Sequence, residues 1–245
     1  MKTNNISVVI PILNEEKNLK KLVKEINKVK NKINIKKFEL ILIDDNSTDK
    51  THEILIYLKK KYNFLKYFIR KNNKRDLSQS CFIGFDKSLY ENILVMDGDL
   101  QHPPKYIEDL SHIFFNKKAD IVIGSRNFFK KRGPGLSFLR YLSSLIIIYI
   151  INFFLDNKTS DPLSGFFIFK KKIYKKHKNK LFGRGYKILA DLIYSTPKKL
   201  KILDREIFFD SRKSGKSKMN IRVLLQLMIF IIRNFLLKWK KIILN

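Results

Sequence analysis

Short apolar runs alternate with amphipathic stretches along the first half of the chain. The runs 6–13, 38–43 and 93–96 are continuous and rich in β-branched or bulky apolar residues, a pattern typical of strands buried on both faces. Residues 65–69 and 121–123 are two further predicted strands. Because helical patterns lie between the strands, the order predicts right-handed crossovers and a mostly parallel sheet in an α/β fold.

Helical spacing of apolar residues follows the first two strands. The recurring positions are Leu19, Leu22, Val23, Ile26 and Val29 in the first segment, and Ile54, Leu55 and Leu58 in the second. Residues 14–16 are expected to open the first helix. A polar loop that begins at Lys71 leads into a third predicted helix.

Two carboxylates, Asp97 and Asp99, follow the strand at 93–96. Residues i and i+2 of an extended segment share a face, so both side chains can point at one spot. Hard oxygen ligands suit Mg²⁺ or Mn²⁺, which usually keeps waters and also binds a substrate diphosphate. Gln101 offers a further oxygen, and Gly98 lets a ligand approach the backbone. An ordinary acidic turn is the alternative, because Asp, Gly and Pro are common turn residues.

Polar clusters stand at three predicted strand ends, at residues 14–16, 44–46 and 97–101. In open α/β sheets, ligands bind beyond the carboxyl ends of the strands, so the three clusters should converge on one crevice. Each cluster by itself could be a helix cap or a turn. Three on the same edge favour a binding site.

The composition limits the class of protein but does not identify its ligand. The chain has 245 residues and is 44% hydrophobic, which suffices for one substantial domain with a few appended elements. Its 51 Lys and Arg against 22 Asp and Glu give a charge of +29, which attracts nucleic acid, anionic lipid or phosphorylated substrates alike. The single cysteine, Cys81, excludes an internal disulfide framework and suits core packing.

Other phosphate-binding motifs are missing from the sequence. It contains neither GxGxxG nor GxxxxGKS, so dinucleotide and P-loop interpretations lack their phosphate cradles. The N-terminus passes directly into an apolar strand without a cleavage site, so no signal peptide is expected.

Five segments occur in the order found in inverting nucleotide-sugar glycosyltransferases: VVIPILNEE, ILIDDNSTDKT, VMDGDLQHPP, IGSRN and SDPLSGFFIF. Over about residues 7–218 the chain resembles glycosyltransferase family 2, and within it the polyprenyl-phosphate mannosyltransferases, including the dolichol-phosphate enzymes. The segments DGDLQHPP and SDPLSGFF make that narrower resemblance specific. It implies a GT-A fold, with a Rossmann-like, mostly parallel sheet.

The resemblance also assigns roles to residues. It implies a nucleotide-sugar pocket formed by Pro11, Asn14, Glu15, Asp44, Asp45, Asp97, Gly98, Asp99 and Lys218. Asp97, Asp99 and Gln101 would hold the divalent metal, and Asp97, Asp99, Arg126 and Arg212 would be catalytic. Arg126, Arg140 and Ser144 would bind the acceptor phosphate. Gly98 stands where the mannosyltransferases commonly have alanine, which leaves the sugar and base open.

The second half of the chain suggests contact with a membrane. A predicted helix at about 136–155 carries Arg140 and Ser144 on one face of a very apolar segment, which suits a lipid-borne phosphate. The alternative is a buried helix with one snorkelling arginine. Its longest apolar stretch, 145–155, is too short to span a bilayer and is expected to lie in the interface.

Two basic segments follow. Arg212, Lys213, Lys216 and Lys218 lie on a loop with Gly and Ser that could close over phosphates, or could be a solvated charge run. In 219–245, Trp239 stands among lysines, which predicts an interfacial membrane helix. A helix docked on the domain, a homodimer contact or a separate membrane-anchoring partner protein are the alternatives.

The predicted function is metal-dependent transfer of a hexose, with mannose favoured, from a nucleoside-diphosphate sugar to a polyprenyl phosphate. Residues 1–218 would form the catalytic domain, 219–245 the membrane-associating helix, and the expected location is the cytosolic face of a membrane. The alternatives are another donor sugar, a soluble glycan acceptor, or a non-catalytic adaptor that binds RNA or anionic membranes. Nucleic acid is not an expected partner, because acidic clusters at three strand ends would repel it.

Overall fold

The computed structural model describes residues 4–71, 74–126, 159–185, 188–196 and 200–209, together with Tyr149, Phe153, Ile229, Ile232 and Arg233. Most of the predicted helix at 136–155 and of the segment 219–245 therefore lies outside the described residues. Among the helices that the structure describes, none has the length and apolar character needed to cross a membrane.

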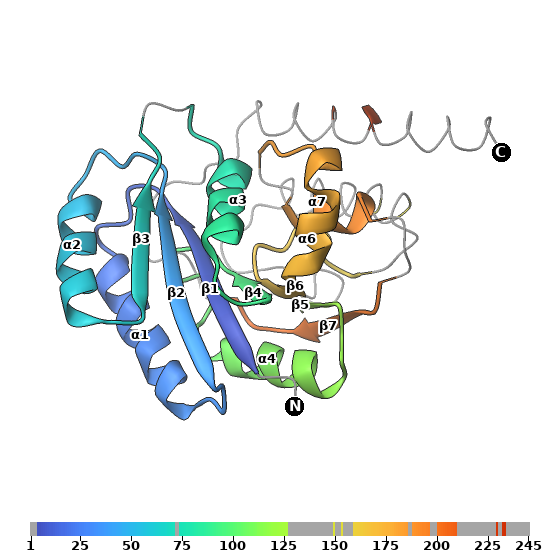
Figure 1. Ribbon diagram of the computed structural model, residues 1–245, viewed down its shortest axis with the longest axis horizontal. Coiled ribbons are helices and arrows are strands. Elements are labelled where there is room, and N and C mark those ends of the chain that lie inside the picture. Colours follow the sequence, from blue (N-terminus) through green and yellow to red (C-terminus); the bar gives the residue numbers. More distant parts are fainter. Residues whose placement is uncertain are drawn as a thin grey trace.

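Within the described residues, the strands form one seven-stranded sheet in the order β3-β2-β1-β4-β6-β5-β7 (Figure 1). The strands are β1 (Asn5–Ile12), β2 (Lys37–Asp44), β3 (Leu65–Ile69), β4 (Asn92–Val95), β5 (Ile121–Ser125), β6 (Phe167–Lys170) and β7 (Ile202–Glu206). Strands β1 to β4 are mutually parallel, β6 is antiparallel to β4 and β5, and β7 is parallel to β5. The prediction of a mostly parallel sheet is confirmed.

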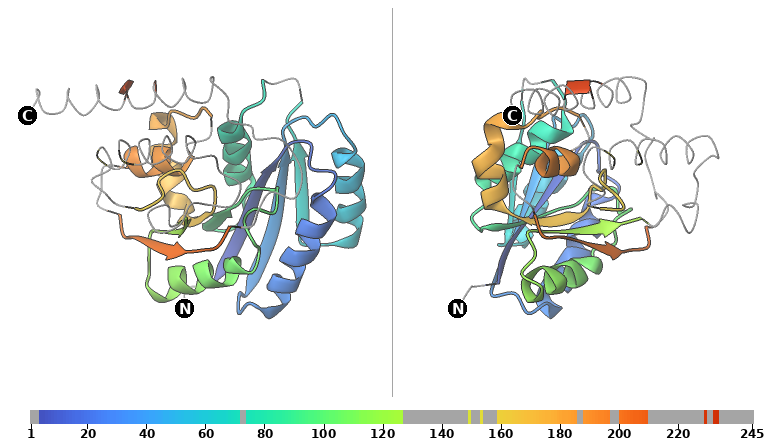
Figure 2. Two further views of the ribbon diagram at one scale, coloured as in Figure 1. Left: turned by 180° about the vertical axis from the view of Figure 1, so that it is seen from behind. Right: turned by 90° about the vertical axis from the view of Figure 1, so that its right-hand side faces the viewer.

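Helices cover both faces of this sheet, as the views in Figures 1 and 2 show. The helices are α1 (Leu19–Lys32), α2 (Thr51–Lys61), α3 (Leu77–Lys87), α4 (Tyr106–Asn116), α6 (Lys171–His177) and α7 (Ile188–Tyr194). One buried cluster joins α1, α2 and α4 to the strands, and the other joins α3, α6 and α7 to the opposite face. The alternation of side chains along each strand supplies both clusters: Val8 and Ile10 point to the first, and Val9 to the second.

Helix α1 begins later than the sequence pattern indicates. Its first residue is Leu19, and Asn18 is the N-cap position, so residues 14–16 belong to the loop between β1 and α1. The polar cluster that the sequence places at a helix start therefore lies at the end of β1. The buried positions Leu19, Leu22, Val23 and Ile26 match the predicted apolar face.

Helix α3 approaches β1 closely because Gly84 has no side chain. A Cβ at Gly84 would lie 2.3 Å from Cγ1 of Val9, a buried residue at the middle of β1. This contact sets the distance between α3 and the central strands, and α3 carries part of the candidate site on its first turn.

We predict that Gly84→Ala lowers the free energy of unfolding by about 1–3 kcal/mol, because the added methyl overpacks the contact with Val9. In Val9→Ala/Gly84→Ala the change at Val9 removes the clashing Cγ1 atom. Urea unfolding should therefore show the double variant to be at least about 0.5 kcal/mol more stable than the sum of the single effects. Simple additivity would contradict this account.

Candidate functional site

The loops that follow β1 and β2 are tied together by backbone-to-side-chain hydrogen bonds. The Asn14 amide donates to Ser47 Oγ at 2.8 Å, and the Thr48 amide donates to Asn14 Oδ1 at 2.8 Å. The Glu15 amide donates to Thr51 Oγ1, at the start of α2, at 2.9 Å. The two polar clusters predicted at these strand ends therefore form one unit at the carboxyl edge of the sheet.

One residue with positive φ lies in each of the loops that follow β1, β2 and β4: Asn14 (φ 56°), Asn46 (φ 62°) and Leu100 (φ 63°). Asparagine tolerates this conformation, whereas for leucine it costs roughly 1–2 kcal/mol. Leu100 is held there because its side chain is buried and because Asp99 Oδ1 accepts a hydrogen bond from the Gln101 amide at 3.1 Å. The strained residue thus lies between two of the predicted metal ligands.

Asp44 and Glu15 are buried at this edge. The Asp44 carboxylate accepts hydrogen bonds from the amide and the hydroxyl of Ser47. Burial raises the pKa of Asp44, and the hydrogen bonds from Ser47 offset part of that effect. Glu15 Oε2 accepts from Asn18 Nδ2 at 2.8 Å. Pro11 lies within β1, opposite Ile43 of β2.

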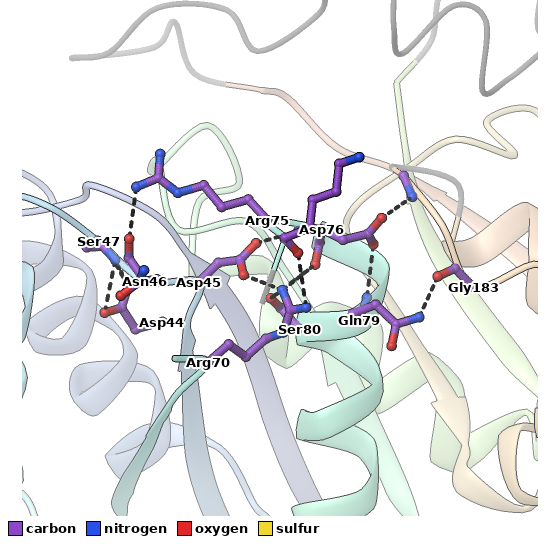
Figure 3. Close-up of polar contacts among 12 residues, drawn as sticks. Asp44, Asp45, Asn46, Ser47, Arg70, Arg75, Asp76, Gln79, Ser80 and Gly183 are labelled. Atoms are coloured by element: carbon purple, nitrogen blue, oxygen red, sulfur yellow. Dashed lines mark hydrogen bonds and ion pairs between the residues drawn. The ribbon is translucent and has the colours of Figure 1, made fainter. Parts of the chain in front are cut away.

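Asp45, the neighbouring residue, is engaged by the buried guanidinium of Arg70 (Figure 3). Arg70 also donates to the carbonyl oxygens of Asp76 and Lys74, at 3.2 and 3.3 Å, and to Ser80 Oγ at 3.3 Å. The other Asp45 oxygen accepts from the Asp76 amide at 2.7 Å. Burial raises the pKa of Asp45, and the positive charge of Arg70 offsets part of that rise.

The same network continues to a loop far along the sequence. Asp76 caps α3, accepting from the Gln79 amide at 3.1 Å, and its second oxygen accepts from the Gly185 amide at 3.0 Å. Gln79 Nε2 in turn donates to the carbonyl of Gly183 at 2.6 Å. Gly183 and Gly185 have φ values of 65° and 79°, which glycine adopts without strain. The loop before α7 is therefore docked on the first turn of α3.

The turn after β4 carries Asp97 and Asp99, as the sequence predicts. The Asp97 side chain is 41% exposed, whereas Asp99 is largely buried. A Cβ at Gly165 would lie 2.7 Å from Asp97 Oδ2, so the SDPLSGFF segment lies directly against this carboxylate. A Cβ at Gly98 would lie 2.9 Å from Cγ2 of Ile12, which brings this turn against the end of β1.

His102 supports the Asp97 end of the turn. Its Nδ1 accepts a hydrogen bond from the Asp97 amide at 3.0 Å. Burial and, to a smaller extent, the charge of Arg126 lower the pKa of His102 to about 3, so the imidazole is neutral. The 3.7 Å approach of Nδ1 to Asp97 Oδ2 is therefore not an ion pair.

Arg126 follows β5 and faces the buried carboxylate of Asp161. Asp161 Oδ2 accepts from the Arg126 amide at 3.2 Å and lies 3.5 Å from Arg126 Nε. Burial raises the pKa of Asp161, and Arg126 acts in the opposite direction. The Arg126 side chain remains 39% exposed, while that of Asp161 is 1% exposed. Asp161, which lies within the SDPLSGFFIF segment, thus packs against this arginine.

The chemistry of the turn fits a divalent cation. Asp97, Asp99 and Gln101 offer carboxylate and amide oxygens, which are the donors that Mg²⁺ and Mn²⁺ prefer. Two carboxylates leave coordination positions for water and phosphate oxygens. In the part of the chain that the structure describes, no group of three or more His, Cys, Asp and Glu side chains is arranged to hold a metal ion.

Four predicted site residues, Arg140, Ser144, Arg212 and Lys218, lie outside the described residues. Three residues that support the site were not identified as such from the sequence: Arg70, His102 and Gly165. His102 and Gly165 fall within DGDLQHPP and SDPLSGFF, so the motifs mark their positions, although not their contacts. For Arg70 the sequence gives one indication of a role in the site, which is its position directly after a predicted strand.

We predict that Arg70→Met destabilises the protein by about 3–5 kcal/mol, because it leaves the Asp45 carboxylate buried without its charge partner. The variant Arg70→Met/Asp45→Asn should recover part of that loss. Lys28→Met, which removes an exposed pair with Glu25, is the control and should cost less than about 1 kcal/mol. Equal effects of Arg70→Met and Lys28→Met in urea unfolding would show that the buried pair has no special role.

Comparisons with known proteins identify the family to which this sequence is similar. The sequence matches Glycosyl transferase family 2 over residues 7–178. The dolichol-phosphate mannosyltransferase of Pyrococcus furiosus is 32% identical over 237 residues, which cover 96% of this chain and 64% of that protein. The chain therefore spans less than two thirds of its length. The Saccharomyces cerevisiae protein of the same name is 28% identical, with 90% of this chain and 83% of that protein covered.

Solved structures share the same fold. Glucosyl-3-phosphoglycerate synthase from Mycobacterium tuberculosis, in complex with Mn²⁺, UDP-glucose and phosphoglyceric acid, matches with a TM-score of 0.71 at 16% identity. The match covers 94% of this chain and 79% of that one. Residues 1–349 of S. aureus TarS, in complex with UDP-GlcNAc, match with a TM-score of 0.63 at 18% identity, over 95% and 66% of the two chains. The family match and the sheet topology together show that this chain belongs to glycosyl transferase family 2 and has the GT-A fold.

Proposed function

We propose that this protein transfers mannose from a nucleoside-diphosphate sugar to the phosphate of a polyprenol at the cytosolic surface of a membrane. The observation that carries the proposal is the alignment of dolichol-phosphate mannosyltransferases with 90–96% of this chain. The nucleotide-sugar complexes of the fold neighbours support the choice of donor class.

On the donor side, the unit formed by the β1 and β2 loops would bind the nucleotide. Asn14, Glu15 and Asp44 lie in that unit, and their backbone or carboxyl groups are held by hydrogen bonds from neighbouring residues. We assign Asp45 a supporting role there, because both of its oxygens are engaged by Arg70 and Asp76. Pro11, Gly98 and Lys218 remain predicted contacts.

On the diphosphate side, Asp97, Asp99 and Gln101 would hold Mg²⁺ or Mn²⁺. Such a cation, when bound, neutralises the charge that builds up on the departing nucleoside diphosphate. The Asx turn at Asp99 and the packing of Asp97 on Gly165 hold the two carboxylates before any ligand arrives. This preorganisation is what transition-state stabilisation by fixed charges requires.

On the acceptor side, Arg126 would bind the phosphate. Its guanidinium is partly exposed, and its backbone amide and Nε are directed at Asp161, which fixes the base of the side chain. An ionised phosphate oxygen can attack the anomeric carbon while the bond to the diphosphate oxygen breaks and the nucleoside diphosphate leaves. Direct attack inverts the anomeric centre and needs no strong general base. Arg140, Ser144 and Arg212 are further predicted phosphate contacts.

The proposal is tested by incubating the protein with Mg²⁺ or Mn²⁺, farnesyl phosphate and a panel of labelled nucleotide sugars. Label in the organic phase from GDP-mannose is the expected result. Label from another donor would correct the sugar, and label in soluble products would overturn the lipid acceptor. Salt-sensitive RNA binding without any turnover would favour a non-catalytic adaptor.

We predict that Asp99→Ala lowers the rate of transfer at least about 100-fold, because it removes a fixed charge beside the diphosphate. The variant should still fold, with a thermal unfolding midpoint only a few degrees lower, because the hydrogen bond from the Gln101 amide is lost. Asp86→Ala, which removes an exposed carboxylate near the end of α3, is the control and should keep the wild-type rate. A near-normal rate in Asp99→Ala would remove the metal assignment.

We predict that Gly165→Ala raises the Mn²⁺ concentration needed for half-maximal activity, by roughly tenfold. The added Cβ must displace the Asp97 carboxylate, whose oxygens lie 2.7 and 3.0 Å from that position. Titration of Mn²⁺ at saturating donor measures the effect. An unchanged Mn²⁺ requirement would show that Asp97 can move away without loss of the metal site.

A further inference from the structure

His102 lies at the centre of a stack of side chains that come from four different segments. Its imidazole stacks on Phe166, which precedes β6, with ring centroids 5.2 Å apart and an angle of 28°. Phe209, which follows β7, meets the imidazole edge-on at 4.9 Å and 77°. The guanidinium carbon of Arg126 lies 4.6 Å from the centroid of the Phe209 ring. The stack therefore runs from the turn after β4 to Arg126.

The polar edge of the same imidazole contacts the turn that carries Asp97. Nδ1 accepts the amide hydrogen of Asp97, so the ring fixes the backbone of the first carboxylate of the turn. A buried imidazole costs more to desolvate than a hydrocarbon ring, so apolar filling alone does not account for it. The side chain instead combines a hydrogen-bond acceptor with an aromatic face at one position.

We propose that His102 is a positioning residue that holds the Asp97 carboxylate and the Arg126 guanidinium in a fixed relation to each other. The inference rests on the proposed function, in which Asp97 serves the donor diphosphate and Arg126 the acceptor phosphate. Reaction requires the acceptor oxygen within about 3–3.5 Å of the anomeric carbon. A rigid stack between the two groups limits relative movement of the two phosphate sites.

Two substitutions separate the two contacts of His102. His102→Phe keeps an aromatic ring between Phe166 and Phe209 but removes the acceptor for the Asp97 amide. His102→Asn keeps an acceptor, since Oδ1 can take the place of Nδ1, but removes the ring. Phe209→Leu removes the aromatic surface beneath Arg126 and leaves the hydrogen bond to Asp97 in place.

Binding measurements on the full-length protein test the proposal without requiring turnover. Titration calorimetry would measure the dissociation constant of Mn²⁺ in the presence of GDP or UDP. A separate titration would measure the dissociation constant of farnesyl phosphate. We expect His102→Phe to weaken Mn²⁺ binding about tenfold and to leave the affinity for farnesyl phosphate within about twofold of the wild-type value. His102→Asn and Phe209→Leu should show the reverse pattern, with farnesyl phosphate weakened about tenfold.

The pattern across variants decides the outcome. Equal weakening of both ligands in all three variants, in proportion to a fall in the thermal unfolding midpoint, would overturn the proposal and leave His102 a core residue. Unchanged binding in every variant would overturn it as well. If the wild type forms no glycolipid but the selective pattern is seen, the proposed function fails and the positioning role of His102 stands.

Discussion

The candidate site depends on one buried ion pair, between Arg70 at the end of β3 and Asp45 at the end of β2. A guanidinium removed from water is stable only when its donors and its charge are matched, and Arg70 meets this need with Asp45, two carbonyls and Ser80. Those partners lie directly after β2, in the loop before α3 and in α3 itself. The charge therefore fixes the relative position of three elements at the edge where the ligand would bind.

The effect of this pair extends beyond its own contacts. Asp76 can cap α3 and also hold the Gly185 amide because its own amide and carbonyl are bound by Asp45 and Arg70. The loop before α7 then receives a second anchor from Asp191, whose carboxylate accepts from the amides of Phe182 and Gly183. Burial raises the pKa of Asp191, and these hydrogen bonds offset part of that cost.

The parts of the fold that the sequence predicts are those with strong local patterns. Strands β1 to β5 are apolar runs, and α1 has a clear buried face, so pattern and topology rules suffice. Strand β7 contains Asp204, Arg205 and Glu206 and is largely exposed, so no apolar pattern marks it. Strand β6 is only four residues long. Its segment was interpreted by its resemblance to a family motif, and no strand was predicted there.

The candidate site was also predictable only in part, because local patterns reveal some of its residues and long-range contacts bring in the others. Convergence of three polar clusters follows from parallel strands and was predictable without coordinates. The supporting residues were not, because their contacts join distant segments: Arg70 to Asp45, Gly165 to Asp97, and Asp161 to Arg126. Nothing in a local pattern distinguishes Asp44 from Asp45. In the structure one accepts from Ser47 and the other is the partner of a buried arginine.

The two halves of the site are held by different kinds of interaction. The β1 and β2 loops are joined by hydrogen bonds from backbone amides, which fix the positions of carboxylates such as Asp44 and Glu15 within narrow limits. The region of Arg126 is held by one hydrogen bond, from the Arg126 amide to the buried Asp161 carboxylate, and by ring contacts with Phe209. A nucleotide has fixed donor and acceptor positions, whereas a phosphate on a flexible lipid can be reached in several poses. The half with more directional hydrogen bonds therefore corresponds to the more specific of the two proposed ligands. His102 contacts the turn after β4 and, through Phe209, the region of Arg126.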